Sequence, residues 1–214
     1  MRLCIAVLIL GMFVSCGQEK KYHDEKNDVT AEVTSDKLAD ILLFQEELNA
    51  EFKDPETSPL ADRFRINFET LDFFEPDTSY VIEAEFVRTP EAIPFSMPTT
   101  TDRESTEVVF GIAKFTIKGV AYQLEIYQSP DLITQEKYED YLFLPFTDRT
   151  NGEETYGGGR YLDLRIPDGN TIVLDFNKAY NPYCAYNKKF SCPLVPAVNN
   201  LDTEIKVGVK AFEH

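Results

Sequence analysis

Apolar and polar residues alternate with a period of two in several segments after residue 80, and this pattern constrains the fold more than any other feature. Successive side chains of a β-strand point to opposite faces of a sheet, so the alternation predicts half-buried strands. The segments are 80–86, 113–117, 122–126, 162–166, 172–176 and 205–211, and residues 142–146 add a short apolar strand. No helical pattern separates them, which favours an antiparallel sandwich or a barrel-like sheet.

Turn signals and one helix complete the expected architecture. Lys118-Gly119 joins two of the segments as a β-hairpin, and residues 167–170, Pro-Asp-Gly-Asn, turn the chain between two others. Residues 91–107 form a Pro- and Thr-rich loop. A helix begins at the cap sequence Ser35-Asp36-Lys37 and ends before Pro55. Its apolar residues at helical spacing are Leu38, Ile41, Leu42, Leu48 and Phe52. The sequence therefore predicts a mainly β domain, residues 35–214, with one N-terminal helix.

Residues 1–16 have the layout of a bacterial lipoprotein signal. Arg2 gives a positive start, an apolar run follows, and Ser15-Cys16 closes it with small residues. The run is too short to span a bilayer of about 30 Å. We expect residues 1–15 to be removed as a signal peptide and Cys16 to carry lipid such as palmitate, as a membrane anchor in the bacterial cell envelope, on the outer membrane. The alternative is an ordinary secretory signal in which Cys16 is incidental.

Residues 16–34 are charged and poor in large apolar side chains, so we expect a disordered tether.

The net charge of −16 at pH 7 argues against several classes of partner. Binding of nucleic acid depends on neutralisation of phosphates by Lys and Arg, which this chain has in deficit. The same deficit argues against adhesion to anionic headgroups, so acylated Cys16 is the expected contact with the lipid bilayer. With His23 and His214 as the only histidines, we expect no metal site and no cofactor.

A glycine-rich segment, residues 146–161, carries the first part of a candidate ligand site. Three successive glycines let backbone N–H groups turn inward, and Arg160 could add a bidentate cation beside them, which would suit a small anion. The residues expected to bind are Asp148, Tyr156, Gly157, Gly159 and Arg160. The alternative is structural: the glycines shape a tight bend, and Arg160 pairs with Asp148 or Asp175.

A second polar segment follows the strand at 172–176. Asp175 could act as a general base, Tyr180 as a proton donor, and Asn177 or Asn181 as a positioning amide. The alternative is a polar network that satisfies the backbone of a long loop. Without a histidine, proton transfer at neutral pH would need a carboxylate or tyrosine with a strongly shifted pKa.

Two cysteines remain once Cys4 leaves with the signal and Cys16 takes the lipid. Cys184 and Cys192 would lie in an oxidising compartment, so we expect a disulfide between them. A redox role is the rival, although the spacing is not the two-residue gap of oxidoreductases.

These segments resemble a known family. The motifs are Phe146-Thr147-Asp148-x-Thr150-x-Gly152, Thr155-Tyr156-Gly157-Gly158-Gly159-Arg160-Tyr161-Leu162 and Asp175-Phe176-Asn177-x-Ala179-Tyr180-Asn181-Pro182-x-Cys184-Ala185. On them the chain resembles a bacterial family catalogued as domain of unknown function 1684, here in a lipoprotein form, with similarity from roughly Phe68 to Phe212. The family pattern differs in having a proline at Tyr183 and an arginine at Asn200. The resemblance implies one core module without an established activity. It also extends to proteins without signal peptides, which raises a role for the thiols.

Three functions stay open from the sequence. The first is a binding module whose C-terminal polar loop holds a small polar or anionic ligand. The second is a hydrolase-like enzyme that uses Asp175, Tyr180 and Cys184. The third is a structural or assembly component of the envelope. Exposure of Arg160 and Asp175 in a deep pocket would favour the first two, and burial in mutual pairs would favour the third.

Overall fold

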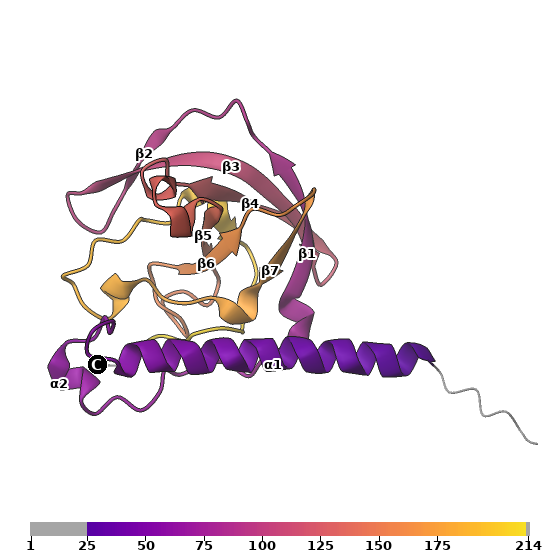
Figure 1. Ribbon diagram of the computed structural model, residues 1–214, viewed down its shortest axis with the longest axis horizontal. Helices are drawn as coiled ribbons and strands as arrows, with labels where there is room; N and C mark the ends of the chain where they lie inside the picture. Colours follow the sequence, from indigo (N-terminus) through magenta and orange to yellow (C-terminus); the bar gives the residue numbers. More distant parts are fainter. Residues whose placement is uncertain (1–24, 213–214) are drawn as a thin grey trace, which may run out of the picture.

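The computed structural model describes residues 25–212, and side chains from residue 33. A long helix, α1 (Glu25–Lys53), crosses one side of a β-sheet domain, and a short helix, α2 (Asp62–Arg65), follows it (Figure 1). The strands are β1 (Val81–Arg88), β2 (Phe95–Pro98), β3 (Glu104–Ile117), β4 (Val120–Gln128), β5 (Tyr141–Asp148), β6 (Arg160–Arg165), β7 (Thr171–Asp175) and β8 (Asn200–Leu201). Single 3₁₀ turns are η1 (Thr78–Tyr80), η2 (Leu132–Thr134), η3 (Glu136–Tyr138), η4 (Phe176–Lys178), η5 (Tyr183–Ala185) and η6 (Ala197–Asn199). Within residues 25–212, no helix has the length and apolar character needed to cross a membrane.

The strands form one sheet that nearly closes into a barrel. Their order is β6-β5-β4-β3-β1-β7, with β2 beside β3 and a short parallel pair between β5 and β8. After β7 the chain returns to β6, where Tyr161 and Tyr180 exchange backbone hydrogen bonds of 2.9 and 3.1 Å. The predicted mainly β, antiparallel, barrel-like fold with an N-terminal helix is confirmed.

The predicted hairpin between β3 and β4 is also confirmed. Ile117 pairs with Val120, and the two turn residues Lys118 and Gly119 have φ angles of 49° and 82°. Two positive φ angles match the right-handed twist of the flanking strands, which is why such turns favour glycine. The turn at 167–170 does not make a hairpin, because β7 pairs with β1 and not with β6.

The helix is longer than the sequence predicted. It begins at Glu25, upstream of the expected cap at Ser35, so residues 25–34 of the expected tether are helical. No glycine or proline stands between Gly17 and Pro55 to stop the helix. Ile41 and Phe52 are buried as predicted, whereas Leu38 and Leu42 are exposed. The expected signal peptide and Cys16 lie outside the described residues.

The expected loop at 91–107 contains a short hairpin instead. Residues 95–98 of β2 pair with residues 104–107 of β3, and Met97 of β2 is fully buried. Pro94 and Pro98 gave the segment the composition of a loop. Proline is tolerated on an edge strand, and β2 lies at an edge of the sheet.

One side chain replaces most of the backbone pairing between β4 and β5, which share a single register pair. Asn199 donates hydrogen bonds of 2.8 Å to the carbonyls of Glu125 and Pro145, and its own side-chain oxygen accepts one of 2.8 Å from the Glu125 N–H. Pro145 has no N–H to give to a neighbouring strand. The Asn199 amide therefore joins the two strands where a proline interrupts their ladder.

The strand predicted at 205–211 does not form, although its alternation is real. Ile205, Val207 and Val209 are buried, as a period of two requires, but the backbone forms only an isolated bridge between Val209 and Phe73 within the described residues. The Arg160 guanidinium donates instead to the carbonyls of Ile205 and Val207, at 2.7 and 2.5 Å. A buried side chain thus takes the place of a partner strand.

Arg160 also forms an ion pair with Asp148 at 2.8 Å, and both side chains have no exposed surface. The other Asp148 oxygen accepts hydrogen bonds from the Thr150 N–H and hydroxyl, at 2.9 and 2.6 Å, and from the Ile205 N–H at 3.2 Å. Burial lowers the pKa of the Arg160 guanidinium, and Asp148 raises it again. A buried charge that lost its partner would be strongly unfavourable, so each residue requires the other.

We expect Arg160→Met to lower the free energy of unfolding by about 3–5 kcal/mol, because it leaves the Asp148 carboxylate and two carbonyls buried without partners. Urea unfolding measures this loss. The control is Arg149→Met, which removes the exposed ion pair with Asp202 and should cost less than about 1 kcal/mol. Equal losses in the two variants would contradict the structural role of Arg160.

Candidate functional site

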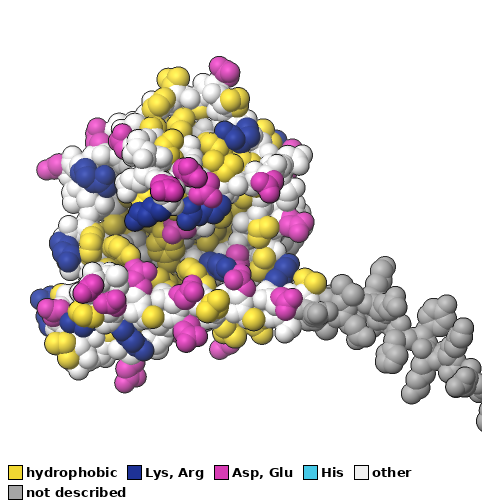
Figure 2. Space-filling model, viewed as in Figure 1, with side chains coloured by type: hydrophobic (Ala, Val, Ile, Leu, Met, Phe, Trp, Pro, Cys, Tyr) yellow, Lys and Arg dark blue, Asp and Glu magenta, His cyan; other side chains and the backbone are white. Residues whose placement is uncertain are grey.

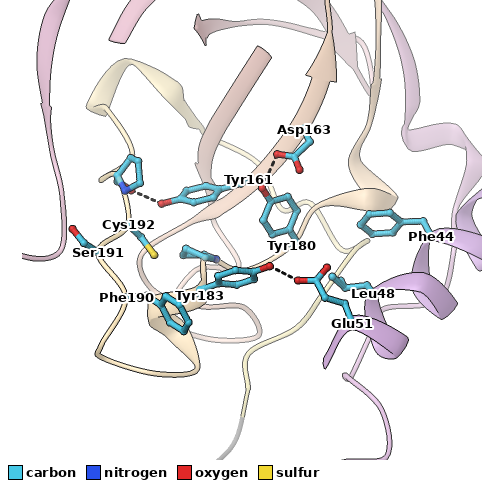
Figure 3. A pocket seen from close by; sticks show the side chains of 12 residues that line it. Phe44, Leu48, Glu51, Tyr161, Asp163, Tyr180, Tyr183, Phe190, Ser191 and Cys192 are labelled. Atoms are coloured by element: carbon cyan, nitrogen blue, oxygen red, sulfur yellow. Dashed lines mark hydrogen bonds between the residues drawn. The ribbon is translucent and has the colours of Figure 1, made fainter. Parts of the chain in front are cut away.

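Two cavities adjoin beside β6, and α1 lines the first of them. The first, called the α1 cavity here, measures about 360 Å³. Its walls are Phe44, Leu48, Glu51, Tyr161, Asp163, Tyr180, Pro182, Tyr183, Phe190, Ser191, Cys192 and Pro193 (Figure 3). In the view of Figure 2, hydrophobic side chains are exposed in a hollow above α1, with charged side chains of both signs along its upper rim.

The second cavity, called the β3 cavity here, measures about 480 Å³. Its walls are Arg103, Glu104, Ser105, Thr106, Glu107, Ser129, Asp131, Leu132, Gln135, Tyr141, Phe143, Tyr161, Tyr180 and Pro193. Tyr161, Tyr180 and Pro193 line both cavities. The backbone pair between Tyr161 and Tyr180 fixes this shared wall, so its shape is set by the closure of the barrel.

A carboxylate holds two of the tyrosine hydroxyls in place. Tyr141 and Tyr180 both donate to the same oxygen of Asp163, at 2.7 and 2.6 Å. Burial, reinforced by the charge of Asp163, raises the pKa of both tyrosines well above 10. Both hydroxyls therefore stay protonated and remain hydrogen-bond donors at any physiological pH.

The remaining tyrosines of the α1 cavity are fixed in the same way. Tyr161 donates to the carbonyl of Pro193, and Tyr183 donates to Glu51 of α1 (Figure 3). Burial raises the pKa of Tyr183 as well, and the hydrogen bond to Glu51 adds to the effect. Because the hydroxyls of Tyr161 and Tyr183 are hydrogen-bonded within the protein, these side chains line the cavity with their aromatic rings.

Apart from its last residue, Tyr161, the glycine-rich segment lines neither cavity. Arg160 and Asp148 are buried against each other, the arrangement that the structural alternative describes, and the guanidinium has no exposed surface. Gly159 has a φ of 91°, and a Cβ there would come within 2.6 Å of the Phe146 carbonyl oxygen. Glycine at 159 therefore permits a close approach to β5. Gly157 is exposed, and a Cβ there would come no closer than 3.7 Å to its nearest neighbour, the backbone of Gly152.

The second polar segment also serves the fold. Asp175 caps η4 by accepting the N–H of Asn177 at 3.0 Å. The buried Asn177 amide donates to the Asp77 carbonyl at 3.0 Å and accepts the Asp77 N–H at 2.8 Å. The buried Asn181 donates to the Lys210 carbonyl at 2.8 Å, and its oxygen has no partner among residues 33–212. These contacts tie the loop after β7 to distant backbone, as the alternative of a polar network proposed.

Of the residues predicted to converge on one ligand, Tyr180 lines the α1 and β3 cavities and Tyr156 lines a different one. Of the three residues named for the hydrolase-like alternative, Tyr180 and Cys184 line different cavities, and Asp175 lines none of these three. The sequence reasoning missed Asp163, Tyr161, Tyr183 and the residues of α1. For Asp163 a signal existed, because it alternates with the inward-facing Leu162 and Leu164 and so must point outward.

The two cysteines lie side by side and are both free thiols. The backbone N–H of Cys184 donates to the sulfur of Cys192 at 3.2 Å, and the Tyr156 hydroxyl lies 4.0 Å from the Cys184 sulfur. Cys192 lines the α1 cavity, and Cys184 lines a third cavity with Tyr156. The predicted disulfide stays a prediction, one that this placement permits.

The hydrogen bond between the two thiols shifts their pKa values in opposite directions. A hydrogen bond from Cys192, aided by Thr100 and Tyr156, lowers the pKa of Cys184 to about 6, and burial opposes it. The same contact raises the pKa of Cys192, as does burial. Cys184 is therefore the nucleophile of the pair. Within the described residues, no group of three or more His, Cys, Asp or Glu side chains is placed to hold a metal ion.

The comparisons with known proteins point to one family. A family described as "Protein of unknown function (DUF1684)" matches residues 66–210. The solution NMR structure of an uncharacterized protein from Haloarcula marismortui is similar, with a TM-score of 0.62 and 30% sequence identity. The similarity covers 87% of this chain and 96% of that one. No curated protein matches the chain.

We expect iodoacetamide to alkylate Cys184 before Cys192 in the reduced, folded protein. The thiolate is the reacting form, so the rate should rise with pH up to about 6 and then level off, whereas an ordinary thiol responds up to about 8.5. Peptide mass spectrometry assigns the modified residue. The Cys184→Ser variant is the control and should react only after unfolding. A rate that still rises above neutral pH would contradict the lowered pKa, and a lack of reaction before reduction would indicate the disulfide.

Proposed function

The chain belongs to the DUF1684 family, and we propose that this member is a lipid-anchored envelope protein that binds a small organic ligand. The ligand site we propose is the pair of adjoining cavities, not the glycine-rich segment first expected from the sequence. One observation carries the proposal: Tyr161 and Tyr180 form a fixed wall between two cavities of about 360 and 480 Å³. Volumes of this size suit metabolite-sized molecules.

The composition of the walls supports binding. Seven of the lining side chains are aromatic, and the polar and charged side chains are concentrated in the β3 cavity. A ligand site combines such aromatic surface with polar groups that fix the orientation of the ligand. The aromatic residues are Phe44, Tyr141, Phe143, Tyr161, Tyr180, Tyr183 and Phe190. Because the four tyrosine hydroxyls already have partners, the rings keep their positions without a ligand. A preformed wall lowers the entropic cost of binding.

The placement of the other polar residues also favours a binding module over the alternatives. An enzyme that used Asp175, Tyr180 and Cys184 would need them around one cavity, and they line different parts of the molecule. A purely structural protein would have no need of a preformed aromatic cavity beside the barrel. Arg160 and Asn177, whose side chains hydrogen-bond to the backbone of distant segments, line neither of the two cavities.

The lipid anchor is the second part of the proposal and is supported by the sequence. Val14-Ser15-Cys16-Gly17 ends an apolar run in the manner of a lipoprotein signal. Acyl chains contribute about 0.8 kcal/mol per buried methylene, so several chains on one cysteine would hold the domain at a bilayer. The ligand site would then work at the membrane surface, most simply on the outer membrane.

Ligand binding can be read from an introduced tryptophan, because the chain has none of its own. Phe44 is half-buried in the wall of the α1 cavity, so the full chain with Phe44→Trp places the reporter beside the ligand. We expect a saturable change in tryptophan emission with at least one member of a panel of small aryl and alkyl amines, alcohols, acids and sugars.

The matched control is Phe74→Trp, a half-buried aromatic that lies over Lys210 and lines neither cavity. It should give no response to the same compound. Equal responses in both variants, or no response from Phe44→Trp to any compound at millimolar concentration, would contradict a ligand site in the two cavities.

We expect an alkynyl palmitate analogue to label the full chain in a bacterial host and not to label the Cys16→Ala variant. The reason is that acyl chains are attached to this cysteine in the proposed mature form. Gel fluorescence after click chemistry measures the label. The Cys184→Ala variant, which keeps Cys16, should label as the wild type does. Secretion of an unlabelled wild-type chain would instead support an ordinary signal peptide.

A further inference from the structure

Glu107 of β3 has a carboxylate oxygen without a partner in the wall of the β3 cavity. The residue is only 4% exposed. One oxygen accepts the Ser105 hydroxyl at 2.7 Å, and the other, Oε2, has no hydrogen-bond partner among residues 33–212. Buried polar atoms are almost always satisfied, so an unsatisfied one beside a cavity points to a missing donor.

Three donors near Glu107, namely Arg103, Tyr127 and Tyr141, form hydrogen bonds with other groups. Arg103 directs its guanidinium to Ser191, with hydrogen bonds of 3.1 Å to the hydroxyl and 3.0 Å to the carbonyl. Tyr127 donates to Glu125 at 2.7 Å, and Tyr141 donates to Asp163. None of these three side chains donates to Glu107 Oε2, which has no hydrogen-bond partner among residues 33–212.

The charges around Glu107 favour a cation. Burial raises the pKa of Glu107, and the charge of Asp131 adds to the rise. The hydrogen bond from Ser105 and the charge of Arg103 lower it. The β3 cavity is lined by three acids, Glu104, Glu107 and Asp131, against the single base Arg103. The adjoining α1 cavity is lined by two more acids, Glu51 and Asp163, and by no base. A positive ligand would offset this excess.

The aromatic walls favour the same charge. The faces of aromatic rings carry partial negative charge and attract ammonium groups. Tyr161, Tyr180 and Phe143 line the β3 cavity together with Glu107. A metal ion does not fit, because no group of three or more ligating side chains exists within residues 33–212.

We propose that the β3 cavity binds an organic ammonium ion, a primary or secondary amine that carries an aryl or alkyl group and donates an N–H to Glu107 Oε2. The apolar part of the ligand lies against Tyr161 and Tyr180 and extends toward the α1 cavity. This inference rests on the proposed function and adds the class of ligand and the residue that recognises it. It replaces the anionic ligand expected from the sequence.

Three compounds of similar size and different charge test the inference: phenethylamine, phenethyl alcohol and hydrocinnamate. Isothermal titration calorimetry on the full chain should give the tightest binding for phenethylamine, by about tenfold or more over the alcohol, as expected for a charge-assisted hydrogen bond. Equal affinity for all three, or tightest binding of hydrocinnamate, would overturn the inference and leave the proposed function standing. Absence of binding by every compound of this trio and of the wider panel would overturn both.

Glu107→Gln tests the recognising residue, since it keeps the shape and removes the charge. The preference for phenethylamine over the alcohol should fall to within about twofold, and the affinity for the alcohol should be unchanged. The variant should also melt at the same or a higher temperature, because it removes a buried carboxylate without a partner. The control is Glu104→Gln, an exposed acid on the same wall, which should keep the preference. A preserved preference in Glu107→Gln, or a lower melting temperature, would overturn the role of Glu107.

Discussion

The ion pair between Arg160 and Asp148 ties residues 205–207, which belong to no strand, to the paired ends of β5 and β6. It connects the end of β5, the start of β6 and the carbonyls of Ile205 and Val207 inside the protein. The ion pair holds the side chain of Arg160, the first residue of β6, inside the barrel. It thereby also determines which residues of that strand point outward. Tyr161 and Asp163 are those residues, so the walls of the two cavities depend on this interaction.

Most of the fold could be predicted from the sequence because burial in a strand is a local pattern. The alternation predicted β1, β3, β4, β6 and β7, and the turn residues Lys118-Gly119 predicted the hairpin between β3 and β4. It failed at 205–211, where the buried face is real but Arg160 supplies the hydrogen bonds of a missing strand. It also missed β2, whose prolines resemble a loop, and the upstream start of α1. Of these failures, the one at 205–211 involves a partner distant in sequence, Arg160.

The candidate site was less predictable for the same physical reason. The sequence indicated a polar and aromatic segment and named Tyr180, which lines both cavities. It could not tell a buried, satisfied polar group such as Asn177 from an unsatisfied one such as Glu107, because satisfaction depends on tertiary contacts. The β-bulge after Val109 also interrupts the alternation that leads back along β3 to Glu107. Recognition of that residue required the folded chain.

The α1 side chains that line the α1 cavity lie outside the residues that the family model matches. The family match covers residues 66–210, whereas Phe44, Leu48 and Glu51 belong to α1. The cavity thus has walls from two separate parts of the chain, the barrel and the helix. Substitutions on that face of α1 would therefore change the shape of the cavity without touching the closure of the barrel or its internal ion pair.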